Sequence, residues 1–127
     1  MSETAEWGNV CSRVDTCALT GAAAFFTGIK GAEVLVNGPL WCYFYALRHL
    51  EKSNSRLGER FHGSQPDNNA VVYGTEECLT DALDYIRENR APSILLIENS
   101  CSVSLIGDDI EGIAAKAKLP FSVIGMD

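Results

Sequence analysis

The chain has 127 residues and a formal net charge of −7, with 46% hydrophobic and 21% charged residues. These values are typical of one folded domain with its own core, and they exclude an intrinsically disordered chain. The negative charge argues against nucleic acid or an anionic membrane as a partner, because nothing would neutralise the phosphates.

The N-terminus and the cysteine count indicate a compartment. Residues 1–10 are acidic and lack the basic region and apolar core of a secretory signal, and the apolar stretch 18–29 is too short to cross a bilayer. We therefore expect a cytoplasmic protein. Five cysteines in a reducing compartment do not predict a disulfide framework, which leaves metal, cluster or redox chemistry, or plain burial.

The chain is predicted to divide into a flexible lead-in, residues 1–16, and a single α/β domain, residues 17–127. Cys11 lies in the lead-in and carries no clear interpretation. Asp15 or Thr16 offers an N-cap for a short helix of small and aromatic residues over 17–29.

A short apolar run and the helix after it form the centre of the prediction. Residues 34–36 lack polar alternation, which indicates a strand buried on both faces. Asn37-Gly38 ends the strand, and Pro39 suits the first position of an amphipathic helix over 40–51. Cys42 is therefore expected in the first turn of a helix at the carboxyl end of a strand, where a helix N-terminus lowers a thiol pKa.

The second half alternates strand and helix signals after a long polar connection, residues 53–69, which we interpret as a solvated loop. The predicted elements are a strand over 70–73, a helix over 75–88 that buries Leu79, Leu83 and Ile86, a strand over 93–98 with an exit loop 99–101, a helix over 108–118 and a strand over 121–124. Right-handed crossovers then predict a three-layer α/β fold of the Rossmann-like type, with a mainly parallel four-stranded sheet flanked by helices.

Three cysteines occupy comparable places: Cys17 at a helix start, and Cys42 and Cys101 directly after strands. Because parallel strands point the same way, the last two must share one edge of the sheet. Their spacing is not that of a compact ferredoxin motif. Thiolates grouped there could hold an iron–sulfur cluster, whereas buried or inert thiols are the default alternative.

Four segments carry a resemblance to a known family: CALTGA from Cys17, VLVNGPLWC ending at Cys42, VVYGTEE from Val71, and NSCSVSLIGDDI around Cys101. In this order and near this spacing they resemble the N-terminal domain of nitrogenase component 1 subunits, which include molybdenum–iron protein subunits, cofactor-assembly scaffolds and dark-operative protochlorophyllide reductases. Family subunits are several times longer, so the resemblance implies that this chain is a fragment of a longer component 1-like subunit.

The resemblance implies a function and its partners. Cys17, Cys42 and Cys101 would ligate a 4Fe–4S or P-cluster-like iron–sulfur cluster at the interface with a second component 1-like subunit, in a homo- or heterodimer. Electrons would arrive from an ATP-dependent iron protein and leave for a reductase active site that this chain does not contain. Alternatives are a cluster or cofactor assembly scaffold and a metal-free α/β interaction module.

Two residues depart from the family pattern: Asn37 stands where many relatives have histidine, and Trp41 where they have glycine. A tryptophan beside the ligand is expected to crowd the cluster or shield it from water. Cys78 is a possible fourth ligand, with packing on the helix flank as the alternative.

We expect the remaining polar residues to have structural rather than catalytic or metal-binding roles. His49 and His62 are expected to be surface residues rather than metal ligands. Asp108 and Asp109 are expected to stabilise a helix dipole rather than to act as a catalytic pair, and the resemblance makes Gly107-Asp108-Asp109 a signature of the loop beside the cluster. No dinucleotide-binding glycine motif follows the first strand.

Overall fold

The computed structural model describes residues 17–52 and 55–127. The predicted lead-in, Cys11 and the proposed caps Asp15 and Thr16 lie outside the described residues. The elements are α2 (Ala18–Thr27), β1 (Ala32–Asn37), α3 (Leu40–Glu51), the 3-10 helix η1 (Leu57–Arg60), β2 (Phe61–Gly63), α4 (Asn68–Tyr73), α5 (Glu76–Asn89), β3 (Ile94–Asn99), α6 (Cys101–Ser104), α7 (Ile110–Lys116) and β4 (Ser122–Met126).

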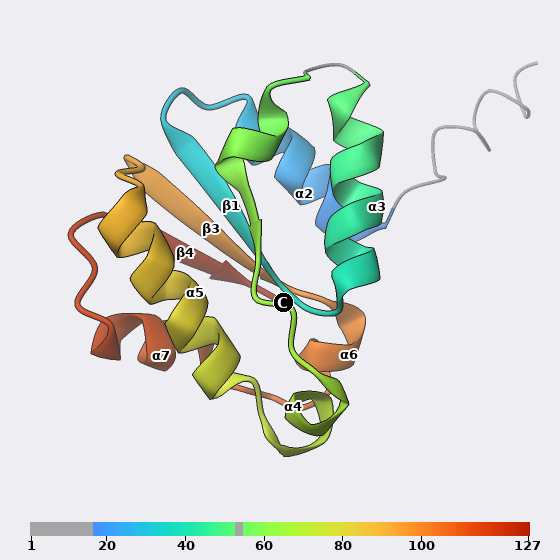
Figure 1. Ribbon diagram of the computed structural model, residues 1–127, viewed down its shortest axis with the longest axis vertical. Coiled ribbons are helices and arrows are strands. Elements are labelled where there is room, and N and C mark those ends of the chain that lie inside the picture. Colours follow the sequence, from blue (N-terminus) through green and yellow to red (C-terminus); the bar gives the residue numbers. More distant parts are fainter. Residues whose placement is uncertain (1–16, 53–54) are drawn as a thin grey trace, which may run out of the picture.

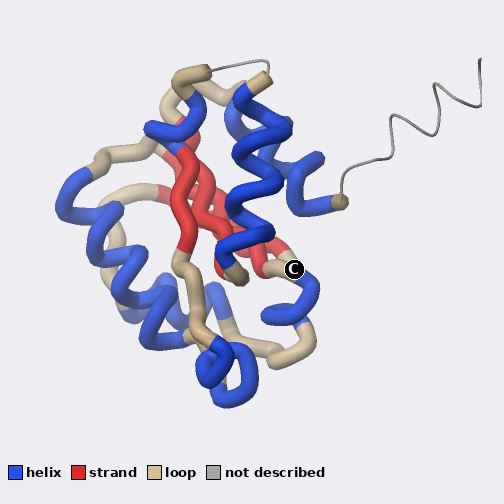
Figure 2. The backbone as a smooth tube through the Cα atoms, turned by 45° about the vertical axis from the view of Figure 1, so that its right-hand side comes forward, coloured by secondary structure: helices blue, strands red, loops and turns tan. Residues whose placement is uncertain are grey.

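The four strands form one parallel sheet in the order β2-β1-β3-β4. Helices α2 and α3 cover one face, and α5 and α7 cover the other (Figure 1). The sheet lies between the two helical layers when the molecule is turned (Figure 2). The predicted three-layer α/β fold is therefore confirmed.

The central strands are apolar on both sides because each side meets a helical layer. Val34, Val36 and Leu96 pack in the core cluster that includes residues of α2 and α3. Leu35 and Ile97 point the other way, into a cluster with the buried face of α5, where the predicted residues Leu79, Leu83 and Ile86 are fully buried. Continuous burial explains why β1 and β3 lack polar alternation.

The predicted second strand is wrong. Residues 70–73 lie in the helix α4, and the second strand is instead Phe61–Gly63, within the expected loop. The Asp67 side chain accepts a hydrogen bond from the backbone N–H of Ala70 (2.8 Å) and so begins α4. This N-cap outweighs the β-propensity of the two valines, which is weak outside a pleated and half-buried surface.

The segment after β3 also differs from the prediction. Cys101 does not end a loop but begins the short helix α6, because Ser100 caps it by accepting a hydrogen bond from the Val103 N–H. The helix predicted over 108–118 is shorter, Ile110–Lys116, with Asp109 as its N-cap.

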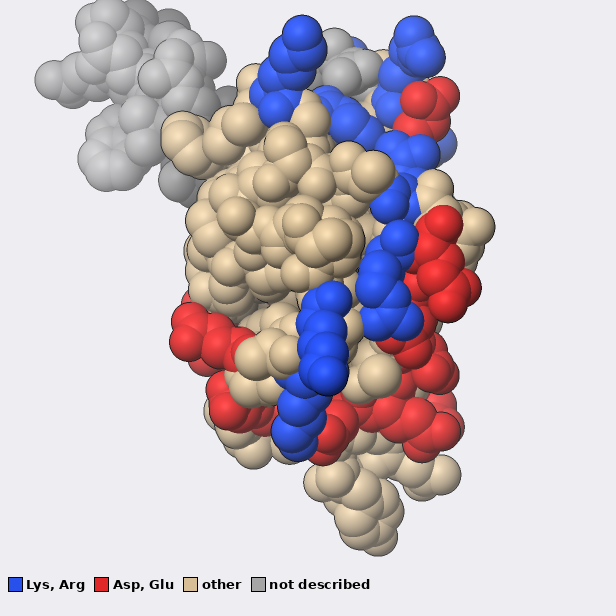
Figure 3. Space-filling view, turned by 90° about the vertical axis from the view of Figure 1, so that its left-hand side faces the viewer, with Lys and Arg blue, Asp and Glu red and all other residues tan. Residues whose placement is uncertain are grey.

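Within residues 17–52 and 55–127, no helix is long and apolar enough to span a bilayer. The face shown in Figure 3 carries a band of Lys and Arg bordered by Asp and Glu, rather than a broad basic surface.

Candidate functional site at the carboxyl edge of the sheet

The loops that carry Cys42 and Cys101 are tied together directly. The backbone N–H of Ser100 donates a hydrogen bond to the carbonyl oxygen of Asn37 (3.1 Å). A Cβ atom on Gly38 would lie 2.5 Å from the Cβ of Ser100, closer than real Cβ contacts allow. Glycine at position 38 therefore permits the two loops to meet.

Asn37 is the centre of a buried hydrogen-bond network at this edge. Its Nδ2 donates to Thr75 Oγ1 and to Asn99 Oδ1, each at 3.0 Å, and its Oδ1 accepts from the Ser64 hydroxyl at 2.7 Å. The side chain is fully buried. The residue that replaces the family histidine thus joins the ends of β1, β2 and β3 to the start of α5.

The two aspartates have different roles. Asp108 Oδ2 accepts hydrogen bonds from the N–H and the hydroxyl of Thr75, at 2.6 and 2.7 Å, and so holds the first turn of α5. Asp109 caps α7 by accepting from the Gly112 N–H at 3.0 Å. The prediction that the pair stabilises a helix start is confirmed for Asp109, whereas Asp108 acts on a different helix because it lies before α7 begins.

The three predicted ligands come from three elements that meet at this edge. Cys17 is the N-cap of α2, Cys42 lies in the first turn of α3, and Cys101 is the first residue of α6. Cys17 and Cys101 are exposed and Cys42 is half-buried, and all three are free thiols. Burial raises the pKa of Cys42, and the charges of Cys17 and Cys101 raise it further, so each of these two thiols lies within electrostatic reach of Cys42.

The pKa of Cys42 does not follow the helix-terminus expectation. It is raised rather than lowered, first by burial and then by the charges of Cys17 and Cys101. Burial also raises the pKa of Cys17, but hydrogen bonds from Thr20 and from the Leu19 backbone outweigh it and bring the pKa below its usual value. Cys17 is therefore activated by local hydrogen bonds.

The donor set fits a cluster better than a single ion. Among the described residues, no three His, Cys, Asp or Glu side chains are close enough to hold one metal ion. A cluster of several irons and bridging sulfides keeps its cysteines farther apart than a single ion does, and cysteine is its usual ligand. The described residues therefore offer no site for a single metal ion, and a cluster is the metal centre left to propose for these cysteines.

The structure does not bring Cys78 to this group. Its thiol lines a separate cavity beside α5 and β2. Burial raises its pKa, followed by the charges of Asp67 and Glu77, with no contribution from another cysteine. The described residues thus supply three grouped thiols and one apart.

The two histidines differ in environment. His49 is exposed, as expected. The expectation is wrong for His62, whose side chain is only 15% exposed and whose Nε2 lies 2.8 Å from Glu33 Oε1. A histidine next to a glycine on a short strand gave no apolar pattern that would predict its burial.

Glu98 is a buried carboxyl that sequence reasoning missed. Its register partners in the sheet are Val36 and Met126, which belong to the core on the α2 and α3 face. Neither carboxyl oxygen has a hydrogen-bond partner among the described residues, and burial raises its pKa to about 8. An acidic residue at the end of an otherwise apolar strand was the signal that could have found it.

An aromatic and apolar surface borders the thiols. Trp41, Phe44 and Tyr45 on α3 are at least half exposed, and Leu105 after α6 is 89% exposed. Trp41, which is expected to crowd a cluster or shield it from water, is 63% exposed. Exposed apolar groups gathered beside a site are typical of a surface that contacts a partner.

An all-parallel sheet with helices on both faces, and with Cys42 and Cys101 directly after two of its strands, defines a class: open α/β domains with thiols at the carboxyl edge of the sheet. Comparison with known families is more specific. Residues 17–126 match the family model "Nitrogenase component 1 type Oxidoreductase", and the chain belongs to this family.

Relatives within the family include both enzymes and assembly proteins. The chain is 29% identical over 103 residues to the nitrogenase iron-molybdenum cofactor biosynthesis protein NifE of Methanosarcina barkeri, covering 80% of this chain and 22% of that protein. It is 33% identical over 110 residues to the nitrogenase molybdenum-iron protein alpha chain of the same organism, covering 80% and 20%. The chain thus spans about a fifth of the length of these relatives.

Solved structures support the fold. A structure titled "Nitrogenase Cp1 at pH 6.5" superposes with a TM-score of 0.76 over 87% of this chain and 25% of that one, at 21% identity. The likeness covers the sheet and its helices, which agrees with the predicted N-terminal domain of a component 1 subunit.

Proposed function

We propose that this chain is an electron-transfer domain in which Cys17, Cys42 and Cys101 hold an iron–sulfur cluster of the 4Fe–4S or P-cluster type. The observation that supports the proposal is that Cys42 and Cys101 follow the neighbouring parallel strands β1 and β3, whose exit loops are hydrogen-bonded to each other, while Cys17 begins α2. Family membership supports it, because relatives are named as a molybdenum-iron protein and a cofactor biosynthesis protein.

The chain's own residues shape this site in three ways. The loops of Cys42 and Cys101 are locked together by Gly38, Ser100 and Asn37. Hydrogen bonds from Thr20 favour the thiolate of Cys17, the form that binds iron. When bound, an iron–sulfur cluster supplies one-electron transfer, with a potential tuned by hydrogen bonds and solvent exposure.

Three thiolates are one fewer than a cubane cluster prefers, which implies a partner. A second component 1-like subunit, identical or different, would complete the ligand set if it covered the exposed surface of Trp41, Phe44 and Leu105. That surface borders the thiols, so one interface would both supply ligands and exclude water. Dimer formation with a shared cluster is part of the proposal.

The donor and the acceptor of electrons lie outside this chain. We propose that an ATP-dependent iron-protein-like reductase delivers electrons and that they pass to a reductase active site in parts of a longer subunit. The chain spans 20 to 22% of the relatives named above, and it is therefore not proposed to be a complete catalyst.

A second candidate is a cluster or cofactor assembly scaffold. The similarity to NifE proteins of Methanosarcina barkeri and of Clostridium pasteurianum, 29% and 26% identical, favours it. A scaffold transfers its cluster to an apo-acceptor faster than it cycles electrons. A stable cluster that is reduced and reoxidised repeatedly, with no transfer to an apo-ferredoxin, would exclude this candidate.

A third candidate is a metal-free α/β interaction module. The Asn37 network favours it, because every polar group of this side chain is satisfied without a metal. If this candidate were correct, replacing the cysteines would leave both metal content and partner binding unchanged.

Anaerobic reconstitution of the full chain with iron and sulfide tests the proposal. We expect iron and acid-labile sulfide in equal amounts and an EPR signal after reduction. Cys17→Ala, Cys42→Ala and Cys101→Ala are each expected to lose most of the bound iron. Cys78→Ala is the matched control and is expected to keep it, because Cys78 lies in a separate cavity. A protein without bound iron and sulfide would contradict the proposal.

A further inference from the structure

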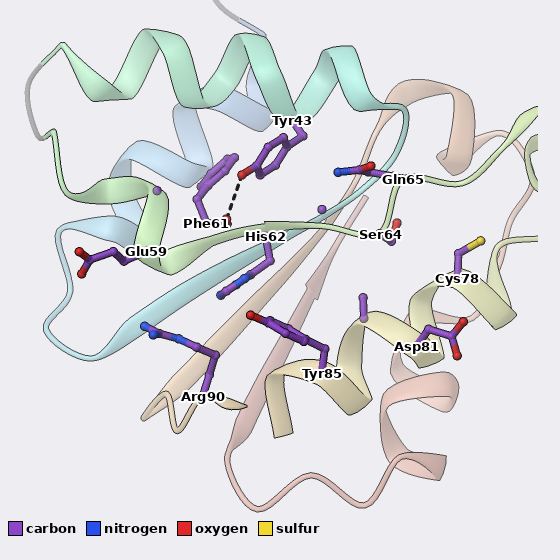
Figure 4. Close-up of a pocket in the computed structure, with 13 residues that line it drawn as sticks. Tyr43, Glu59, Phe61, His62, Ser64, Gln65, Cys78, Asp81, Tyr85 and Arg90 are labelled. Atoms are coloured by element: carbon purple, nitrogen blue, oxygen red, sulfur yellow. Dashed lines mark hydrogen bonds between the residues drawn. The ribbon is translucent and has the colours of Figure 1, made fainter. Parts of the chain in front are cut away.

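The cavity that Cys78 lines has a volume of about 690 Å³ and lies along β2 between η1, α3 and α5 (Figure 4). Its volume is within the usual range for small-molecule pockets, about 300–1,000 Å³. None of the three proposed cluster ligands lines it. The site is therefore separate from the thiols and is not used by the proposed function.

A buried carboxylate organises one end of this cavity. Glu33 of β1 has a side chain only 6% exposed, and its Oε1 accepts hydrogen bonds from His62 Nε2 at 2.8 Å and from Arg90 Nε at 2.9 Å. Burial of a carboxylate is costly unless it is paired, so Glu33 fixes the positions of both partners. Glu33 therefore holds the imidazole of His62 and the guanidinium of Arg90 in place beside the cavity.

The donor groups that remain are directed at the cavity. Arg90 uses only its Nε for Glu33, and its two terminal nitrogens have no partner in the part of the chain that the structure describes. The second ring nitrogen of His62 has none there either. The Tyr85 ring lies edge-on to His62, with centroids 6.4 Å apart, and Figure 4 shows its hydroxyl on the same side. Three donors thus come from β2 and from the C-terminal end of α5.

The acceptor that suits this arrangement is an oxyanion. A guanidinium whose Nε is engaged still presents its terminal N–H groups as a planar fork, which matches the two oxygens of a carboxylate or phosphate. Acidic groups elsewhere in the cavity limit the size of the anion. Asp81 lies on the α5 wall away from Arg90, and Glu59 lies on the η1 side with its carboxylate directed outward (Figure 4). The charge of Glu59 also acts on Arg90. Both carboxylates disfavour a polyanion more than a small molecule with one oxyanion.

We propose that the cavity between β2 and α5 binds a small molecule through a carboxylate or phosphate group, held by Arg90, His62 and Tyr85. This site does not depend on the cluster, and it can exist whether or not Cys17, Cys42 and Cys101 bind iron. The two oxyanions share the same recognition chemistry, and the experiment below separates them.

The test is an NMR titration of the full apo chain with inorganic phosphate and, separately, with acetate. We expect a saturable shift of the backbone amides of Gly63 and Ser64 and of the Arg90 side chain with at least one of the two probes. Saturation by phosphate alone or by acetate alone identifies the source of the oxyanion. No saturable shift with either probe would overturn the proposal.

Two variants distinguish binding at a specific anion site from non-specific ion binding. Arg90→Lys keeps a cation beside Glu33 but removes the fork, and Tyr85→Phe leaves the Glu33 contacts intact. Each is expected to weaken binding by roughly tenfold, the scale of a lost hydrogen bond to a charged group. Tyr73→Phe on α4 is the matched control, because Tyr73 is exposed and does not line the cavity. Equal affinity in all three variants would mean that the anion binds elsewhere and would overturn the proposal.

Discussion

Two buried glutamates on neighbouring strands show how differently the two faces of this sheet treat a charge. Glu33 on β1 faces the α5 side and is bonded to His62 and Arg90. Glu98 on β3 faces the α2 and α3 side, where neither of its oxygens has a partner among the described residues. One face compensates a buried carboxylate, and the other raises the pKa of its carboxyl to about 8.

The two faces of the sheet therefore differ in how they accommodate a buried carboxyl group. The Glu33 group is a satisfied ion pair that joins β1, β2 and the end of α5. Glu98 is an unsatisfied buried acid in the layer that also contains Cys42. Buried polar groups without partners are rare in native proteins and concentrate where function or strain requires them. The α2 and α3 face therefore contains a buried carboxyl group without a hydrogen-bond partner among the described residues, and Cys42 packs on this same face.

Removal of the paired carboxylate should have the largest effect on stability. Glu33→Ala leaves Arg90 and His62 without their acceptor, and we expect the free energy of unfolding to fall by about 3–5 kcal/mol. Urea denaturation measures this loss. Glu111 on α7 is exposed, so Glu111→Ala is expected to change the free energy of unfolding little. A loss below about 1 kcal/mol for Glu33→Ala would mean that the pair is not a structural one.

The unpaired carboxyl should make stability depend on pH. Glu98 has a usual pKa of 4.5 and a folded pKa of about 8, so between these values the folded state holds a proton that the unfolded state releases. The contribution of Glu98 to the free energy of unfolding is thus fully present below about pH 4.5 and is lost as the pH rises to about 8. At pH 7 the loss is about 3 kcal/mol, because one pKa unit is about 1.4 kcal/mol.

Glu98→Gln tests this dependence, since it keeps the shape without the charge. The variant and the wild type are expected to have similar stability near pH 4.5, and the variant is expected to be more stable at pH 8. Glu111→Gln on α7 should follow the wild type at every pH. Parallel stability curves for Glu98→Gln and the wild type would show that Glu98 ionises freely in the folded protein.

A smaller effect is expected where the two faces meet at the thiol loops. Gly38→Ala places a methyl group 2.5 Å from the Cβ of Ser100, and we expect a loss of about 2 kcal/mol together with weaker iron binding. Gly21→Ala is the matched control, because a Cβ there meets nothing within 4 Å. In helix α2 that change should be neutral or stabilising. Equal stability of the two variants would argue against close packing of the loops.

The smallest predicted effect concerns the two aspartates. Asp108→Asn weakens the bonds to the Thr75 N–H and hydroxyl, and we expect a loss of about 1 kcal/mol. Asp109→Asn keeps a good N-cap for α7 and should cost a few tenths of a kcal/mol at most. Thermal unfolding of the two variants gives the comparison. The reverse order would mean that Asp109, rather than Asp108, anchors this loop.

The elements with strong patterns were predictable. The apolar runs of β1 and β3 and the periodic helix α5 agree with the structure to within one or two residues, and α3 agrees fully. Strand β2 was not predictable, because it has three residues, only one of them apolar, and it forms only by pairing with β1. Helix α4 was misassigned because its N-cap, Asp67, was read as part of a loop.

The part of the site that follows from the direction of the strands was predictable. Parallel strands place Cys42 and Cys101 at one edge whatever the details of packing, and in the structure the charge of Cys17 also acts on Cys42. The Asn37 network and the pairing of His62 with Glu33 join residues that are 27 to 62 positions apart. Such contacts depend on three-dimensional packing, which local patterns do not encode. The acidic residue at one end of each apolar strand was the available signal.

Iron K-edge EXAFS on the anaerobically reconstituted chain tests the central claim most directly. We predict a first shell of sulfur only and a short iron–iron distance, both lost in Cys42→Ser and both kept in Cys78→Ser. Iron with nitrogen or oxygen ligands and no iron neighbour, or a spectrum unchanged in Cys42→Ser, would contradict a cluster held by Cys17, Cys42 and Cys101.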